Sequence, residues 1–483
     1  MRLPTQLRSL LAAALLAPLL LPGAAGASAV TAATVAEYAP RGQWPSVTTI
    51  TWTADPGEVN RVEIAPGSGG VVLRDAAGPI RVGGECRALP DGAAVCNLAG
   101  SSRTVVLRAG DGDDEVRVGL VPTNVEIEGG DGSDSLIATD GHGAKLDGGP
   151  GDDVITGSSG NDAIAGGAGA DRIEAGAGGD TIVDDPPEGP FSADLIDGGP
   201  GDPNSPGQDS VRYQRTSAVH VDLGAGVGGA PGEGDRLSGI ENADGGSGDD
   251  VLIGDEHDNA LNATSPVPSA AKGADRVEGR GGDDDLRGDA GALLFGGAGD
   301  DRFAGSKASF DGGSGDDSFA DPSGPVRCGD GRDGITGATQ AATVAPDCES
   351  VQLADVTVDD LRVEGARLRL TLDPGRTHYA PGCGFALTLR GAGADTRLLA
   401  RRVVPMRAGR VRSRTVTLVL RQPPRALVRI VVQRRACRGG RTPRVGRPSR
   451  YDGFLWQPPA ATTDRTLARQ TAAEPLRERR RVG

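Results

Sequence analysis

Isoleucine recurs at nine-residue intervals along residues 148–183. This segment reads GGPGDDVIT, GSSGNDAIA, GGAGADRIE and AGAGGDTIV, four consecutive units without an insertion. The eighth position of every unit is isoleucine, at Ile155, Ile164, Ile173 and Ile182. A single apolar residue between two flanking residues predicts a three-residue strand that buries one side chain. One such strand cannot bury its isoleucine alone, so the period predicts a stack of coils that share a narrow core.

The residues between consecutive strands are rich in glycine and contain one aspartate per unit. Glycine allows φ > 0 and leaves room for a tight turn; the turn glycines that we single out are Gly149, Gly151, Gly160, Gly167, Gly169 and Gly178. The sixth position of the four units is aspartate, at Asp153, Asp162, Asp171 and Asp180. Carboxylates and turn carbonyls are suitable ligands for Ca²⁺, which takes about six to eight oxygens. One turn cannot supply that many by itself.

The pattern G-G-x-G-x-D-x-U-x, where U is a large aliphatic residue, resembles the RTX (haemolysin-type) calcium-binding nonapeptide repeat. The resemblance implies that each unit is half a coil of a parallel β-roll. It also implies that units two apart stack and hold an ion between them, with backbone carbonyls and both aspartates as ligands. Asp153 would then be paired with Asp171, and Asp162 with Asp180. A disordered Gly/Asp-rich linker is the alternative, but it would not keep isoleucine at a strict interval.

Further units follow the same pattern outside this run. They place candidate calcium ligands at Asp114, Asp134, Asp250, Asp284, Asp301 and Asp317. Degenerate units carry Asp275, Asp333 and, in place of the aspartate, Asn259. The intervening segments 288–295 and 305–311 are shorter than a nonapeptide. Asp284 could therefore pair with Asp301, or Asp301 with Asp317, depending on which short segments count as half-coils.

These patterns divide the chain into five regions and predict an all-β protein. Residues 354–457 contain longer alternating segments without repeats, which suggest an immunoglobulin-like β-sandwich. The stretch 328–349 resembles a cap found in secreted actinobacterial calcium-binding members of the family. The expected order is a signal peptide (1–29), a β-rich N-terminal cap (30–108), a parallel β-roll or β-solenoid of nonapeptide repeats (109–353) interrupted at 184–244, the C-terminal β-sandwich (354–457) and a disordered basic tail (458–483).

Composition and charge support an elongated fold rather than a large globular one. The 483 residues include 77 glycines but only three Trp, four Tyr and seven Phe, too few large side chains for a conventional core. Residues 356–483 carry 28 Arg and nine Asp or Glu, a net charge of +19, whereas residues 1–355 carry −34. An acidic segment of this kind stays expanded until cations neutralise it. The basic end could bind an acidic polymer, a membrane surface or nucleic acid, or it could be the arginine-rich surface of an ordinary β domain.

Residues 1–29 have the features of a secretory signal peptide. Arg2 and Arg8 precede an apolar run, small residues follow, and cleavage is expected after Ala27 or Ala29. No later apolar run is long enough to span a membrane. Six cysteines fit the extracellular setting that this predicts.

The cysteines fall into three neighbouring pairs along the chain. Sequential pairing is the simplest connectivity: Cys86 with Cys96, Cys328 with Cys348, and Cys383 with Cys437. Zinc binding is the alternative. No C-x-x-C motif or nearby histidine favours it.

The favoured function is a secreted, non-enzymatic calcium-binding protein, structural or adhesive, whose repeats fold on extracellular calcium. The sequence contains neither H-E-x-x-H nor G-x-S-x-G, which disfavours a zinc protease or an esterase. A polysaccharide-active enzyme on a β-helix is one alternative, with Tyr213 among the few residues that could stack on a sugar. Another is a module that binds an acidic cell-surface polymer or an extracellular protein through its Arg-rich C-terminal domain. Nucleic acid is not an expected partner.

Overall fold

A computed structural model gives the fold, and the elements that it describes are strands. It describes residues 28–36, 46–68, 70–98, 102–139, 141–184, 191–200, 208–265, 273–305, 307–337, 342–345, 347–348, 350–353, 356–364, 367–373, 384–391, 398–405, 414–420, 428–435 and 452–456. Within these ranges no helix could cross a membrane. The predicted signal peptide up to residue 27, the tail at 458–483 and the pair Cys383 and Cys437 lie outside the described residues.

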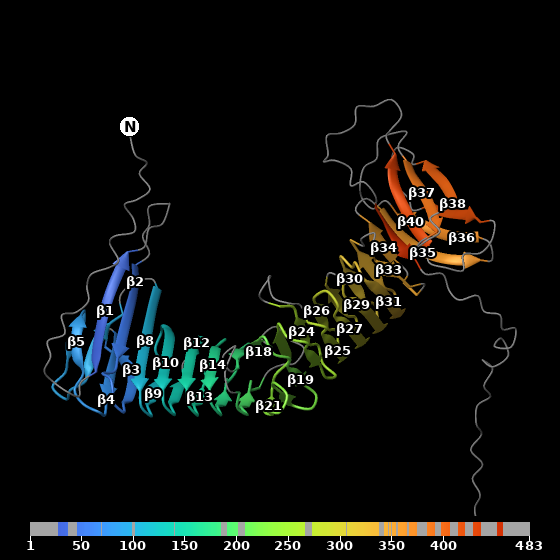
Figure 1. Cartoon of the computed structure of the whole chain (residues 1–483). Coiled ribbons are helices and arrows are strands. Elements are labelled where there is room, and N and C mark those ends of the chain that lie inside the picture. The colour runs from blue at the N-terminus through green and yellow to red at the C-terminus, as the bar shows by residue number, and fades with distance from the viewer. Residues whose placement is uncertain are drawn as a thin grey trace, which may run out of the picture.

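Two stacked sheets form the long body of the molecule (Figure 1). We call the first sheet A. From β2 onward its neighbouring strands pair in parallel up to β34, and β1 pairs antiparallel with β2. Its strands are β1 (Ala29–Ala36), β2 (Ser46–Thr53), β8 (Ser102–Asp111), β10 (Asn124–Asp131), β12 (Ala144–Pro150), β14 (Ala163–Ala168), β16 (Thr181–Val183), β18 (Ser210–Arg215), β22 (Asn242–Gly246), β24 (Ala260–Ala263), β26 (Asp285–Gly288), β28 (Arg302–Ala304), β30 (Ser318–Ala320), β32 (Gly334–Thr336) and β34 (Ser350–Leu353).

The second sheet, sheet B, runs alongside sheet A, and in the regular coils the chain passes from one sheet to the other at each turn. Its strands are β3 (Arg61–Gly67), β9 (Glu115–Val118), β11 (Ser135–Ala138), β13 (Val154–Thr156), β15 (Arg172–Glu174), β17 (Leu195–Asp197), β19 (His220–Asp222), β20 (Val227–Gly228), β21 (Asp235–Ser238), β23 (Val251–Ile253), β25 (Arg276–Gly281), β27 (Leu293–Ala298), β29 (Ser309–Ser314), β31 (Pro325–Asp330) and β33 (Thr343–Val344). One strand from each sheet makes one coil, which is the geometry that two nonapeptides were expected to form.

The core between the sheets receives one side chain from each short strand. In sheet B, Ile155 stands in register with Leu136 on one side and Ile173 on the other. In sheet A, Ile164 and Ile182 stand in register in the same way. All five side chains are buried. Because each coil adds so little apolar surface, stability has to accumulate from coil to coil.

Phenylalanine replaces the aliphatic residues near the C-terminal end of the stack. Phe303 and Phe319, on neighbouring sheet A strands, have stacked rings with centroids 4.7 Å apart. Phe310 in sheet B meets both rings edge-on, at 6.0 and 6.1 Å. The three side chains are buried and pack against one another in the core.

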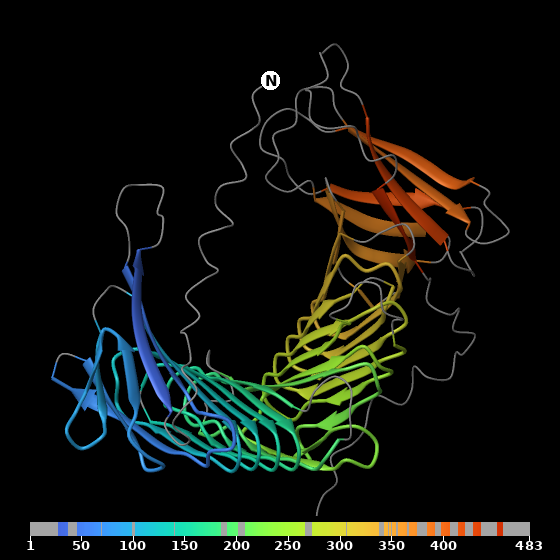
Figure 2. The same cartoon turned by 60° about the vertical axis from the view of Figure 1, so that its left-hand side comes forward.

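The stack bends in its middle, and strand order explains the direction (Figures 1 and 2). Sheet A runs β16–β18–β22–β24, with two strands between its ends. Over the same coils sheet B runs β17–β21–β20–β19–β23–β25, with four. Neighbouring strands lie about 4.8 Å apart, so sheet B is longer by about 10 Å. The body therefore turns toward sheet A, and sheet B lies on the outer side of the bend.

Antiparallel strands close the N-terminal end of the stack. The strands β4 (Gly70–Asp75) and β7 (Ala94–Asn97) extend sheet B from β3 as antiparallel neighbours. The strands β5 (Arg81–Gly84) and β6 (Cys86–Ala88) complete this end, and Cys86 forms a disulfide with Cys96 on β7. The first coil is already present here, because β2 and β3 pair in parallel with β8 and β9.

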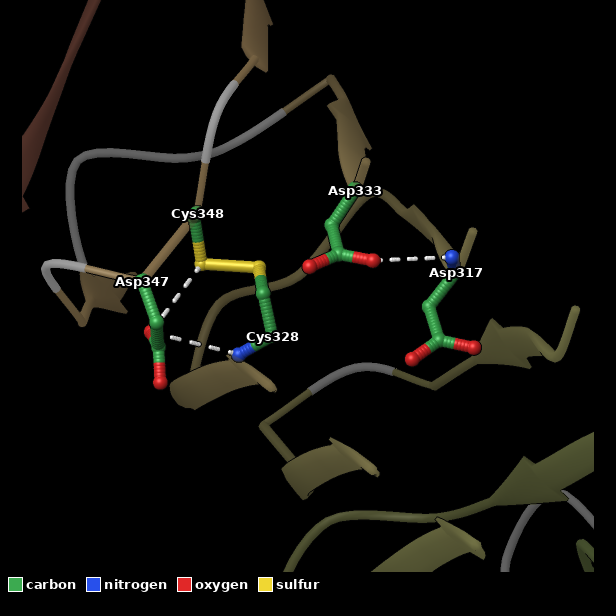
Figure 3. The surroundings of a disulfide bond; sticks show 5 residues. All are labelled: Asp317, Cys328, Asp333, Asp347 and Cys348. Atoms are coloured by element: carbon green, nitrogen blue, oxygen red, sulfur yellow. Dashed lines mark hydrogen bonds between the residues drawn. A yellow bond between two sulfur atoms is a disulfide. The ribbon is translucent and has the colours of Figure 1, made fainter. Parts of the chain in front are cut away.

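The C-terminal end is closed by a second disulfide and by strands that continue both sheets. Cys328 bonds to Cys348, and the backbone N–H of Cys328 donates to Asp347 Oδ1 at 3.4 Å (Figure 3). Two of the three predicted cysteine pairs are thus disulfides. Sheet A continues antiparallel into β35 (Val356–Glu364), β36 (Arg367–Asp373) and β39 (Arg414–Val419), while sheet B continues into β41 (Asp452–Trp456), β40 (Val428–Arg435), β37 (Gly384–Gly391) and β38 (Leu398–Pro405). The immunoglobulin-like arrangement of these strands stays a prediction.

Replacing Phe319 with alanine is expected to lower the free energy of unfolding by about 3–5 kcal/mol, because the stacked ring pair becomes a cavity. Phe295→Ala is the matched control: Phe295 is only half-buried and packs under Arg276 on the outer side of sheet B. The control should cost about 1 kcal/mol or less. Denaturant unfolding at saturating calcium compares the two. Equal losses would contradict a core role for the ring cluster.

Candidate metal centre

Aspartates of successive turns lie in register along the edges of the stack. We call the turns from sheet A to sheet B edge 1, and those from sheet B to sheet A edge 2. On edge 1 the backbone N–H of Asp134 donates to Asp153 Oδ1 at 2.7 Å, and that of Asp153 donates to Asp171 Oδ1 at 2.9 Å. Each carboxylate therefore satisfies the backbone of the coil before it, and the side chains form a continuous row.

The same arrangement holds on edge 2. The N–H of Asp162 donates to Asp180 Oδ1 at 2.7 Å. Farther along, the backbone N–H of Asp284 donates to Asp301 Oδ1 and that of Asp301 donates to Asp317 Oδ1, both at 2.9 Å. The structure thus brings together Asp153 with Asp171 and Asp162 with Asp180. It also brings together both alternative pairs of the second array, because the short segments lead into β27 and β29, the sheet B halves of complete coils.

The two edges carry their carboxylates over different lengths of the stack. Edge 1 holds, in spatial order, Asp114, Asp134, Asp153, Asp171, Asp194, Asp235, Val219, Asp250 and Asp275. Beyond Asp275 that position is taken by residues without a carboxylate, among them the buried Ala292 and Ala308. Edge 2 holds Asp162, Asp180, Asp209, Glu241, Asn259, Asp284, Asp301, Asp317 and Asp333. The rows overlap in the middle of the molecule.

Four members of these rows were not singled out from the sequence: Asp194, Asp209, Asp235 and Glu241. All lie in the predicted interruption, where prolines and insertions break the nine-residue period. A shorter signal remains. Each is an acidic residue two positions before a buried aliphatic or small side chain, as in Asp194-Leu-Ile196 and Asp209-Ser-Val211. Searching for that triplet instead of the full nonapeptide would have found them.

The second oxygen of these carboxylates is buried without a hydrogen-bond partner. This holds among the described residues for Oδ2 of Asp114, Asp134, Asp153, Asp171, Asp180, Asp194, Asp250, Asp275, Asp284, Asp301 and Asp317. Burying a polar oxygen without a partner is costly, and native proteins rarely leave one so. A row of such oxygens, repeated at the same position of each coil, indicates that a positively charged ligand belongs there.

Backbone carbonyls face the same points as these oxygens. A methyl carbon added to Gly148 would collide with both Asp153 Oδ2 and the carbonyl oxygen of Gly166. The added carbon at Gly296 would meet Asp301 Oδ2 and the Gly312 carbonyl in the same way. The carboxylate of one coil and the carbonyl of the next therefore converge on a gap that only glycine leaves open. Carboxylate and carbonyl oxygens are the donor set that Ca²⁺ prefers, so these residues fit the ion.

Turn glycines hold the backbone close enough for this convergence. Gly151 has φ of +147°, and a side chain there would collide with the Gly132 carbonyl of the preceding coil. Gly149, Gly167, Gly169 and Gly178 also have positive φ, at 103°, 110°, 140° and 140°. Gly160 differs, since its φ is not positive, but an added Cβ would lie 2.6 Å from the Gly143 nitrogen. At Gly160, glycine is required only because the backbone of the neighbouring coil lies so close.

Comparison with known protein families identifies the repeat. The model of the RTX calcium-binding nonapeptide repeat matches in four copies, at residues 147–182, 237–265, 269–292 and 293–307. The chain carries RTX calcium-binding repeats. The first copy covers the uninterrupted run of four nonapeptides, and the other three cover RTX coils beyond the start of β21. No curated protein matches the chain.

Burial sets the protonation of the RTX carboxylates when no cation is present. Loss of hydration raises the pKa of Asp153 to about 7, and the nearby charge of Asp171 adds to the effect. The same cause raises the pKa of Asp171 to about 6 and that of Asp284 to about 8. Calcium binds the deprotonated carboxylate, so an ion entering these positions has to displace protons.

Calcium binding by the RTX rows is expected to weaken as pH falls from about 8 to about 5.5. An unfolded aspartate has a pKa near 3.9, so calcium-free coils bind more protons when folded than when unfolded. Their stability without calcium is therefore highest at acid pH and falls as pH rises through the values near 6, 7 and 8. Far-ultraviolet circular dichroism in chelator, and calcium titrations at several pH values, measure the two trends.

The two measurements control for each other, because the expected trends have opposite signs. A calcium midpoint that stayed constant between pH 5.5 and 8 would contradict titration of the buried carboxylates. A metal-free β signal that increased with pH would do so as well.

Proposed function

We propose that this protein is a secreted, calcium-stabilised structural or adhesive protein whose RTX array orders when it meets extracellular calcium. Extracellular calcium modules bind at about 10⁻⁴–10⁻³ M, so the low calcium of a cytosol would leave such an array unfolded. The protein would then be exported as an extended chain and become rigid outside the cell.

The rows of buried, unpartnered carboxylate oxygens carry this proposal. Each row places acidic side chains on consecutive coils with the thin core beneath them. Without a cation the carboxylates must take up protons or repel one another, and both oppose stacking at neutral pH. A divalent ion shared by two coils removes the repulsion and joins the coils. Folding and calcium binding are therefore the same event.

Two further observations support an extracellular setting and a non-catalytic role. The described cysteines are paired in two disulfides, which persist in oxidising compartments. Tyr213, a residue that a polysaccharide-active enzyme could have used to stack on a sugar, is buried and donates its hydroxyl to Asp235 Oδ2 at 3.0 Å. The many carboxylates stand at turn positions that suit metal ligation, so they need no glycosidase-like explanation.

Replacing Asp171 with asparagine is expected to raise the calcium concentration at the midpoint of folding by roughly tenfold, because a row on edge 1 loses one charged ligand. Far-ultraviolet circular dichroism of the protein from residue 30 onward follows the gain of β signal with calcium. The wild-type chain should show a cooperative transition near millimolar calcium.

Asp152→Asn is the matched control. Asp152 is exposed, and its Oδ1 accepts the N–H of Ala170 at 2.9 Å, a bond that asparagine can keep. The Asp152→Asn variant loses the same charge as Asp171→Asn without altering a buried carboxylate oxygen. Equal shifts of the calcium midpoint in both variants would mean that the Asp171 substitution acts only through the loss of overall charge. Full β signal in chelator would rule out calcium-driven folding.

A further inference from the structure

An arginine is buried where the stack bends. Arg215 ends β18, and its side chain has no exposed surface. Its guanidinium forms ion pairs with Asp184 and Glu233, and the bond to Glu233 Oε1 measures 2.7 Å. The guanidinium also lies over the ring of Phe191, 4.0 Å from its centroid. Such complete burial of a charge requires a partner of opposite sign, and here there are two.

The arginine lies on edge 1, at the coil that has lost its aspartate. The turn after β18 reaches β19 through Val219, which takes the position held by Asp194 and Asp235 in the coils before it. Val219 brings no carboxylate, so this coil cannot contribute its own ligand to the row. The break in the row and the buried guanidinium thus coincide.

Acidic side chains enter the gap that glycine leaves open elsewhere. Asp184 comes directly after Val183 of β16, as Gly166 comes directly after Ala165 of β14, and Val183 and Ala165 stand in register on neighbouring coils. An added Cβ on Gly166 would point at Asp171 Oδ2, so Asp184 directs its carboxylate toward the corresponding gap. In the coil of β21, an added Cβ on Gly229 would lie 2.6 Å from both Asp235 Oδ2 and Glu233 Oε2.

These carboxylates make a cluster with the geometry of a cation site. Oxygens of Asp184, Glu233 and Asp235 all lie within 4.8 Å of one another. Asp184 and Asp235 are buried, and Glu233 is half-buried with a side chain only 1% exposed. In the regular coils such a set of oxygens would face an ion. Here the guanidinium of Arg215 binds two of the three, and the hydroxyl of Tyr213 binds the third.

We propose that Arg215 is a built-in cation, which closes the bend without calcium and keeps residues 208–246 folded while the neighbouring coils still need the ion. The inference rests on the proposed function only for the calcium dependence of those neighbours. The bend then serves as a permanent template on which the coils of both arms stack when calcium arrives. Formation of a first coil is the costly step of a stacked fold, and a preformed one removes it.

Hydrogen exchange of the wild-type protein in chelator tests the first half of the proposal. Backbone amides of β18, β21 and β22 should be protected at least tenfold more than those of β13, β14 and β15. The comparison stays within one chain and one sample. Equal exchange at the bend and in the regular coils would overturn the proposal.

Arg215→Gln tests the second half. Removing the guanidinium leaves three carboxylates facing one another, so the bend should lose its protection in chelator and regain it in millimolar calcium. Native mass spectrometry should count one more bound Ca²⁺ than in the wild type. Arg215→Lys keeps a cation and should keep protection in chelator without an extra ion.

Arg212→Gln is the matched control, because Arg212 lies on the same strand but is exposed and pairs with Asp244 at 3.0 Å. It should leave protection and ion count unchanged. If Arg215→Gln loses amide protection at the bend equally with and without calcium and binds no further ion, Arg215 forms only an ordinary structural ion pair. If instead the regular coils of the wild type are protected in chelator, the proposed function fails, while the extra ion of Arg215→Gln still decides the role of Arg215.

Discussion

Stacking of like charges is the constraint on which this structure depends. Each regular coil places an aspartate directly over that of its neighbour, and the N–H···Oδ1 bond between them gives a partner to only one oxygen of each carboxylate. The other oxygen is buried with backbone carbonyls around the same gap. Since a coil adds one or two apolar side chains to the core, hydrophobic burial alone does little to offset that charge. On the function proposed above, the cation is therefore part of the fold rather than an addition to it.

The molecule satisfies this constraint differently along its length. The carboxylate row of edge 1 serves the N-terminal coils, the row of edge 2 serves the C-terminal coils, and both are present around Asp153 and Asp180. Where edge 1 changes to alanine, the core gains Phe303, Phe310 and Phe319. In these C-terminal coils, ring stacking thus accompanies carboxylates that stand on edge 2 only. At the bend, the carboxylate row of edge 1 is interrupted and the phenylalanine cluster is absent. There the guanidinium of Arg215 lies between the carboxylates.

The regular part of this fold was predictable because one short-range rule governs it. Isoleucine at every ninth residue and aspartate two positions before it correctly placed strands such as β13 and β14 and the turns between them. The bend was not predictable, because β19 pairs with β23 rather than with β17, and that choice depends on contacts distant in sequence. The acidic residues of the two rows in that region, Asp194 and Glu241 among them, were missed for the same reason. No sequence signal indicated the role of Arg215, because that role depends on three acidic residues that come together only in the folded chain.

The extra strands of sheet B have a consequence for how this molecule could change in evolution. The turn at its centre follows from a difference in strand number between two hydrogen-bonded sheets, not from a hinge, so thermal motion cannot easily straighten it. Each arm can gain or lose whole coils at positions away from the bend without altering the direction in which the arms leave it. The number of coils in each arm could therefore change while the angle of the bend stays the same.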